Sequence, residues 1–421
     1  MSPSHRLIHR LVVIGAVAAA AMLAAGPAVA DWSTGLELYN QGRFEEAAEH
    51  FRAAVQSNPS WSGGYLMLGR CQLALKQYDE ALDNLQSAVT LAPEDPANVA
   101  AMGRALMAAD RVSEARELLE GVDLENLEPA WYVEMSRMLT HCLLAEDRAA
   151  DAVEMLETRL SEVPDSAALH ATLGSAYQTA GDRAAALDHL ASAFALDPGD
   201  HASGRAAAST AMALAESAGD DELAASLYGR ALELAADLAT ATGGYEDFLL
   251  AGEAARGAHQ EEAAAKWFAA AVTERPQEPL ARFYLGRTLA DLDREGEAVE
   301  HLRAALGAAP EDELTRRIHR RLGRLLACRL ELPEAARHYR AAGDDDRAGR
   351  IDEIAADIGT ALERLATLRD DAAEMAAIEK ELEALGDADG VQAVASRREN
   401  MLRQIAAIET NLSDVRAAFC R

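Results

Sequence analysis

A sequence frame that recurs about every 34 residues is the feature that most constrains how this chain can fold. Alanines recur at 47, 81 and 115, and a glycine stands 12 residues before each one, at Gly35, Gly69 and Gly103. A bulky apolar residue follows each alanine by four positions, and a proline closes several units. A fixed period of this length is typical of solenoids, in which each unit packs against its neighbours. The frame therefore predicts an array of stacked units rather than one closed core.

Within a unit, the apolar residues follow the period of a helix. In the second unit, Tyr65, Leu68 and Leu73 lie on one face of a predicted first helix, and Leu82 and Leu85 lie on a second. Apolar residues make up 50% of the chain but aromatics only 5%, so the core must pack through close helix contacts. Alanine is also the best helix former. We expect an all-α fold.

These units resemble tetratricopeptide repeats, which are helix-turn-helix units of 34 residues. The signature positions that match best are Gly69, Ala81, Leu85, Ala88 and Pro93; Gly174, Tyr177, Ala186, Leu190, Ala193 and Pro198; and Gly286, Ala298, Leu302, Ala305 and Pro310. The resemblance implies a solenoid of about nine units over residues 31–343. We expect these units near 31–61, 62–95, 96–129, 130–165, 167–200, 203–238, 243–278, 279–312 and 314–343. The sixth lacks the signature glycine and the closing proline, so we expect a hinge or a change of curvature there.

After Gly343 the repeat stops and a heptad pattern begins. Apolar residues recur every seven positions from Ile354 to Leu382, and a second series runs from Val394 to Val415. Residues 386–390 have the composition of a turn. We expect an antiparallel helical hairpin over 344–421. The alternative is an intermolecular coiled coil, which would make a homodimer.

The first 30 residues have the pattern of a secretory signal peptide. Arg6 and Arg10 form a positive start, and an uncharged apolar run follows from 11 to 25. Ala28-Val29-Ala30 then forms a small-x-small cleavage site. We expect export across the inner membrane to the periplasm, with no membrane segment left after cleavage. An uncleaved membrane anchor is the alternative.

The four cysteines lack the spacing of a zinc site. Cys71 and Cys142 occupy equivalent places in two first helices, and we interpret them as small core residues. A hairpin of two similar arms would return Cys420 to the ninth unit, where Cys328 lies. In an oxidising compartment, a disulfide between them would join the hairpin to the array. Two free thiols are the alternative that the sequence leaves open.

Charge and motifs restrict the function. The formal net charge is −30, which argues against nucleic acid as a partner. The sequence contains no zinc-protease, serine-hydrolase, phosphate-loop or EF-hand motif. Its histidines are dispersed through predicted helices. We therefore expect no enzyme activity, no metal and no cofactor.

An arginine directly follows the signature glycine in four units, at Arg70, Arg104, Arg287 and Arg324. The resemblance implies that this position faces the concave groove. A guanidinium group there can bind the carboxylates of a partner peptide in bidentate fashion. The alternative is neutralisation by acidic groups of the same chain, which we favour for the arginines from 316 to 324 because the acidic hairpin starts close by.

The groove of the first units is also expected to be partly apolar. The residues expected there are Trp32, Leu36, Leu73 and Met107. The lysine and asparagine clamp of the chaperone-binding subclass is not present at the corresponding positions. Such a surface suits a helix or an extended peptide. Alternatively, Trp32 caps the first unit.

Together these features predict a non-catalytic scaffold of the cell envelope that binds a peptide or helix of a partner protein in its groove. Repeats of this kind serve many unrelated assemblies, so the fold does not name the partner. Two further functions stay open. One is a structural protein that assembles with itself through residues 344–421. The other is an accessory subunit of an envelope enzyme or of a secretion or assembly complex.

Overall fold

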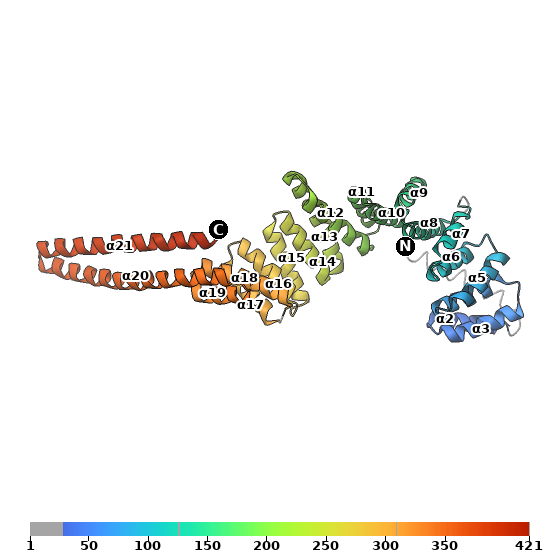
Figure 1. Ribbon diagram of the computed structural model, residues 1–421, viewed down its shortest axis with the longest axis horizontal. Helices are drawn as coiled ribbons and strands as arrows, with labels where there is room; N and C mark the ends of the chain where they lie inside the picture. Colours follow the sequence, from blue (N-terminus) through green and yellow to red (C-terminus); the bar gives the residue numbers. More distant parts are fainter. Residues whose placement is uncertain (1–27, 125–126, 309, 421) are drawn as a thin grey trace. The chain divides into compact units, whose positions relative to one another are not determined.

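The computed structural model describes residues 28–124, 127–308 and 310–420, and every regular element in these ranges is an α-helix (Figure 1). This confirms the all-α class. Most of the expected signal peptide lies outside the described residues, and α2 (Ala28–Asn40) begins with its last three. No helix in the described ranges combines the length and the hydropathy that a membrane span requires.

The chain divides into two compact bodies between Thr210 and Ala211. The N-terminal body contains five antiparallel helix pairs. They are α2 with α3 (Phe44–Ser57), α4 (Ser62–Ala74) with α5 (Tyr78–Leu91), α6 (Pro96–Ala108) with α7 (Val112–Glu120), α8 (Pro129–Ala145) with α9 (Ala149–Glu162), and α10 (Ala167–Ala180) with α11 (Arg183–Leu196). Helix α12 (His201–Ser217) contains the division.

The C-terminal body continues the pattern. Helix α13 (Asp221–Thr242) is followed by three further pairs and then by two long helices. The pairs are α14 (Tyr245–Gly257) with α15 (Glu261–Glu274), α16 (Pro279–Asp291) with α17 (Glu295–Gly307), and α18 (Asp312–Cys328) with α19 (Leu332–Ala341). The predicted helix-turn-helix solenoid and its following hairpin are therefore present.

The two helices of a pair approach closely where the signature glycine lies. A Cβ atom added to Gly69 would stand 2.5 Å from Leu85 Cγ and 3.2 Å from the carbonyl oxygen of Ala81. The equivalent atom on Gly174 would stand 2.6 Å from Leu190 Cγ. Only glycine leaves room for the bulky side chain of the second helix, so the periodic glycine is a packing requirement.

The turn within a pair also follows one geometry. In eight of the pairs one turn residue has a positive φ between 55° and 89°. These residues are Gly42, Lys76, Asp110, Asp147, Gly181, His259, Asp293 and Leu330. Among the described residues, the turn between α12 and α13 has none, and Ala224, at the signature position of α13, is only half-buried. The sixth repeat therefore departs from the common geometry, and the division between the two bodies falls within it.

The first helices of successive pairs form a continuous row in the N-terminal body. Helix α4 contacts α6, α6 contacts α8, and α8 contacts α10. In a stack of helix pairs, a row whose members touch one another lies on the inner side of the curve. The first helices therefore present the concave face of this body.

The last two helices form an antiparallel hairpin, and they lie side by side in Figure 1. Helix α20 (Asp345–Leu385) ends at Gly386, which adopts the left-handed conformation, and α21 (Ala388–Cys420) starts two residues later. The expected turn over 386–390 is thus wrong in length, because Asp387 accepts a hydrogen bond from Gly390 N and α21 begins at the next residue, Ala388. The buried seam of α20 consists of Ile351, Ile358, Leu365 and Ala372. Ile405 of α21 packs into the same cluster as Leu365 and Ala372.

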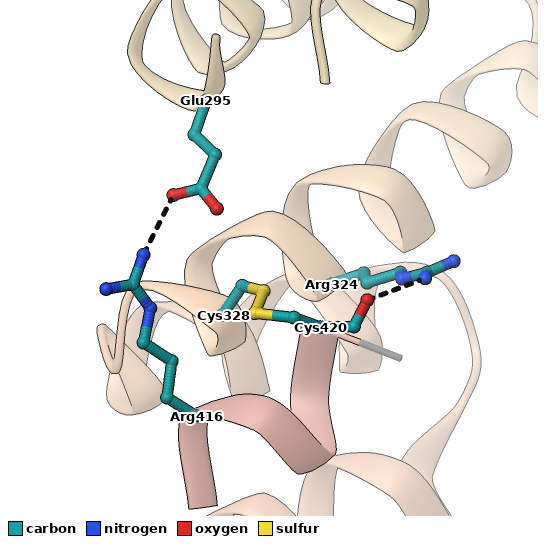
Figure 2. The surroundings of a disulfide bond; sticks show 5 residues. All are labelled: Glu295, Arg324, Cys328, Arg416 and Cys420. Carbon is teal, nitrogen blue, oxygen red and sulfur yellow. Dashed lines mark hydrogen bonds and ion pairs between the residues drawn. A yellow bond between two sulfur atoms is a disulfide. The ribbon is translucent and has the colours of Figure 1, made fainter. Parts of the chain in front are cut away.

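The C-terminal end of α21 is attached to α18 (Figure 2). A disulfide joins Cys328 to Cys420, whose Cα atoms are 5.1 Å apart. Arg324 donates from Nη2 to the carbonyl oxygen of Cys420 at 3.2 Å. Arg416 lies 3.9 Å from a carboxylate oxygen of Glu295, the first residue of α17. Leu412, Val415 and Phe419 pack against the core of the C-terminal body.

Candidate binding groove

The concave face of the N-terminal body contains a cavity of about 700 Å³, which we call the groove. Its walls come from α6, α8, α10 and the start of α12, and these are all first helices of their pairs. Leu190 of α11 also reaches it. Volumes of this size are typical of binding sites in proteins. The groove lies where the stacked first helices leave a trough.

The floor of the groove is apolar. Met107, Met138 and Leu144 line it together with the small side chains of Ala171 and Ala206. Met138 is 5% exposed, whereas Met107 and Leu144 are half-buried and accessible from the trough. Methionine adapts its shape to different apolar partners. This floor can therefore accept an apolar side chain of a bound segment.

Charge is distributed unevenly along the groove. At the α6–α8 end, Arg104 Nη2 donates to Glu134 Oε1 at 2.7 Å, and Arg137 Nη1 lies 3.4 Å from the other oxygen of that carboxylate. Two guanidinium groups share one carboxylate there, so this end keeps a positive charge. At the α12 end, Asp200 accepts hydrogen bonds from the main-chain N and the hydroxyl of Ser203, at 3.2 and 2.5 Å. The groove is basic at one end and acidic at the other.

The arginines expected to form a stripe belong to two separate bodies. Arg70 and Arg104 lie in the N-terminal body, and Arg104 lines the groove. Arg70 of α4 is half-buried, and burial lowers the pKa of its guanidinium; Tyr39 acts in the opposite direction. Arg287 and Arg324 lie in the C-terminal body, beside a different cavity. The structure therefore does not unite the four arginines in one described site.

Neutralisation within the chain holds for part of the segment from 316 to 324. Arg316 Nη2 lies 2.6 Å from Glu313, and Arg321 pairs with Asp291 of α16. Arg317 has no carboxylate partner among the described residues; it stacks on the ring of Phe283, with 4.8 Å between its Cζ and the ring centroid. Neutralisation by acidic groups of the same chain, which we favoured for this segment, therefore holds for Arg316 and Arg321 but not for Arg317.

The apolar residues expected in the first units take different positions. Met107 lines the groove, whereas Leu73 packs against the core on the α4 side. Trp32 lies against Phe51 and Trp61, with ring centroids 5.0 and 4.3 Å away. Leu36 packs on the same cluster. This packing is that of a cap on the first helix pair, so the position of Trp32 does not require a bound partner protein.

Sequence reasoning missed the groove residues of α8. The spacing from Ala115 to Ala152 is 37 residues rather than 34, so Thr140 takes the place of the signature glycine. His141 then takes the position that Arg104 holds one repeat earlier, and it is exposed in the groove. Counting 12 residues back from Ala152 would have found it.

Among the described residues, one cluster has the side chains and the spacing of a metal site, but the disulfide removes its two thiolate ligands. Glu295, Cys328 and Cys420 place one ligand atom each within 4.8 Å of the others. Both sulfur atoms are bonded to each other, so neither is a free thiolate. The two remaining cysteines, Cys71 and Cys142, are buried, and burial raises the pKa of Cys71 to about 12.

The stacked helix pairs and their concave groove define a helical repeat protein. One sequence model described as tetratricopeptide repeat matches residues 33–96 and 249–313, and a second such model matches 73–133. The chain is a tetratricopeptide repeat protein. No curated protein matches this sequence.

Several solved structures are similar to this chain. The C-terminal part of a tetratricopeptide repeat protein from Cytophaga hutchinsonii is 15% identical, with a TM-score of 0.47, over 60% of this chain and 99% of that one. A tetratricopeptide repeat protein from Parabacteroides merdae is 14% identical, with a TM-score of 0.40, over 63% of this chain and all of that one. The type IV pilus biogenesis factor PilW has the same identity, TM-score and coverage.

Proposed function

We propose that this protein is a non-catalytic scaffold that binds a segment of a partner protein in the groove of its N-terminal body. The observation that carries the proposal is the groove itself, an apolar trough with opposite charges at its two ends. Solenoids use their concave faces as extended binding surfaces. An amphipathic helix or an extended peptide in such a groove is a recurring mode of recognition.

The groove favours one polarity of the bound segment. Its basic end, at Arg104 and Arg137, favours a segment with acidic residues there. Its acidic end, at Asp200, favours basic residues at the opposite end. Complementary charges steer association and fix orientation more than they add affinity. The apolar floor between them supplies the affinity through buried side chains of the partner.

We further propose that the protein acts in the cell envelope. The leader-like first 30 residues support this location. The Cys328–Cys420 disulfide supports it independently, because disulfides persist in oxidising compartments. Acidic composition continues to argue against a nucleic acid partner.

The experiment is selection of peptides from a random library on the intact protein. We expect selected peptides with apolar residues flanked by acidic residues on one side and basic residues on the other. Replacing either Met107 or Leu144 alone with aspartate should weaken their binding about 10- to 100-fold, since burying one apolar side chain contributes ~1.5–3 kcal/mol. The matched control is Leu196→Asp, because Leu196 is an exposed leucine of α11 that does not line the groove.

A second variant tests the polarity. Arg137→Glu should select peptides with fewer acidic residues at the corresponding end, while the apolar positions stay the same. Peptides that bind the Met107 and Leu144 variants as tightly as the original protein would refute the groove as the binding site. Unchanged charge preference in Arg137→Glu would refute the proposed polarity alone.

A further inference from the structure

The C-terminal body contains a second cavity whose walls are unusually rich in arginine. It has a volume of about 360 Å³, and six arginines line it together with Phe283 and Tyr339. The arginines come from three helices: Arg287 from α16; Arg317, Arg320, Arg321 and Arg324 from α18; and Arg347 from α20. We call it the arginine cavity. Such a cluster is unexpected in a chain whose formal net charge is −30.

Three of the six guanidinium groups are engaged by groups of the chain. Arg321 pairs with Asp291 and also donates to the carbonyl oxygen of Arg287 at 3.3 Å. Arg347 lies 3.5 Å from a carboxylate oxygen of Asp344. Arg324 donates to the main-chain carbonyl at the end of α21. These contacts fix the positions of the three side chains around the cavity.

The other three arginines have no carboxylate within ion-pair distance in the part of the chain that is described. Arg317 stacks on Phe283, and Arg287 has only other arginines and Asp291 among the charges that act on it. Arg320 lines both this cavity and an adjoining one. Asp344, Asp345 and Asp346 line the adjoining cavity, but none of them forms an ion pair with Arg320. These three guanidinium groups therefore lack a direct carboxylate partner, and the nearest acidic groups act on them only at longer range: Asp291 on Arg287, and Glu313 on Arg317 and Arg320.

Burial makes this excess of charge more costly. The pKa of Arg287 is lowered, first by burial and then by the charge of Arg256. Arg321 Nε is buried and has no hydrogen-bond partner among the described residues. Buried donors without partners are rare in native proteins, and each one calls for an acceptor. The cavity offers many donors and an excess of positive charge.

The chemistry of the walls restricts the ligand. Guanidinium groups donate hydrogen bonds and accept none, so the ligand must present acceptor oxygens. The guanidinium groups of Arg317 and Arg347 stack on the two aromatic rings, so charged groups lie over the main apolar side chains of the cavity. One carboxylate would neutralise a single charge, whereas each phosphoryl group carries about −1.5 to −2. At ~30 Å³ per water, the volume corresponds to about a dozen water molecules. A compact ligand with two linked phosphoryl groups matches both the charge and the volume.

We propose that the arginine cavity binds a compact, multiply charged oxyanion of the phosphate class. The site lies in the C-terminal body and does not depend on the groove or on the function proposed for it. Free diphosphate and a diphosphate group carried on a larger molecule share this chemistry. Arginine binds such groups in bidentate geometry, which lysine does not reproduce.

Calorimetric titration of the intact protein with inorganic pyrophosphate tests the proposal, at about 0.1 M NaCl to screen weak surface binding. We expect saturable binding at one site per chain and weaker binding of inorganic phosphate. The double variant Arg287→Gln with Arg320→Gln should weaken pyrophosphate binding at least ten-fold, since each removes charge-assisted hydrogen bonds. The control is Arg316→Gln, because Arg316 lies on the same helix but pairs with Glu313 and does not line the cavity.

A second readout does not depend on how the variants fold. Pyrophosphate should raise the unfolding temperature of the unmodified protein, because a ligand that binds only the folded state stabilises it. Absence of both binding and stabilisation would overturn the proposal, as would equal weakening by Arg316→Gln. Citrate that binds as tightly as pyrophosphate would overturn the phosphate class. An otherwise identical diphosphate ester that binds more tightly than free pyrophosphate would support a carried group as the source.

Discussion

Removing the disulfide should loosen the end of the hairpin while the repeats stay folded. The bond joins residues 92 positions apart in sequence. In the chain-entropy model, a disulfide that closes a loop of this length lowers the conformational entropy of the unfolded chain. This stabilises the folded state by about 4.6 kcal/mol at 25 °C. This value is an upper bound for Cys420→Ser, because the α20–α21 contacts still hold part of the loop together. Without the bond, the last turns of α21 are still held to the C-terminal body by Leu412, Val415 and Phe419, which pack against its core, and by the hydrogen bond from Arg324.

Hydrogen exchange followed by mass spectrometry measures this effect helix by helix. Each 1.4 kcal/mol lost should speed exchange about ten-fold, so the bound above allows up to ~10³-fold for peptides from the last turns of α21. We expect at least a ten-fold increase there in Cys420→Ser, and the same increase when the unmodified protein is reduced. Peptides from α4 to α10 should exchange at unchanged rates, because that body lacks the bond.

The matched control for this prediction is Arg416→Gln. It removes the exposed ion pair with Glu295, which contributes ~0–1 kcal/mol, and leaves the disulfide intact. Its exchange should stay close to that of the unmodified protein. Equal exchange of α21 in the oxidised and reduced proteins would show that the bond does not hold the hairpin, and the reasoning would be wrong.

Three further predictions concern helix packing, turn geometry and partly buried histidines. Gly69→Ala should destabilise the protein by ~1–3 kcal/mol, because the added Cβ would overlap Leu85. Gly359→Ala should stabilise it by ~0.5–1 kcal/mol, because Gly359 lies in α20 with open space around it. Urea unfolding measures both changes in the free energy of unfolding. Lys76→Gly should stabilise by up to ~1 kcal/mol because Lys76 has a φ of 60°, and Lys76→Ala, which keeps the unfavourable φ, should not. Burial, and then the neighbouring histidine, lower the pKa values of His189 and His338 from 6.5. The unfolded chain therefore binds more protons, so their contribution to stability is present above about pH 6.5 and is lost as the pH falls through the lowered pKa values. Replacing both with glutamine should flatten that part of the stability profile, and an unchanged slope would contradict the assignment.

The repeat frame predicted the fold because each of its residues has one physical task. Gly69 and Ala81 mark where two helices touch. Their small size can be read from the sequence without knowing which residues they contact. The left-handed turn residues were not predictable in the same way. Lys76, Asp110 and Leu330 share one backbone conformation but no side-chain chemistry, because the packing of the two helices imposes the turn.

The site was predicted less completely than the fold. Arg104 and Met107 were expected in a groove and lie in one, but the stripe through Arg287 and Arg324 assumed a regular array. The sixth repeat breaks that array, and its atypical turn and half-buried Ala224 reflect the missing glycine. The pairing of Arg321 with Asp291 depends on side chains 30 residues apart on different helices, which periodicity alone does not reveal.

The most direct test of the central claim is site-specific photo-crosslinking of a selected peptide. A photoreactive residue replaces His141, which is exposed in the groove, or Gln86, which is exposed on the second helix α5. If the groove binds the partner segment, the peptide should crosslink at position 141 and not at 86, and an excess of unlabelled peptide should abolish the product. Crosslinking at 86 that equals or exceeds that at 141 would contradict the account.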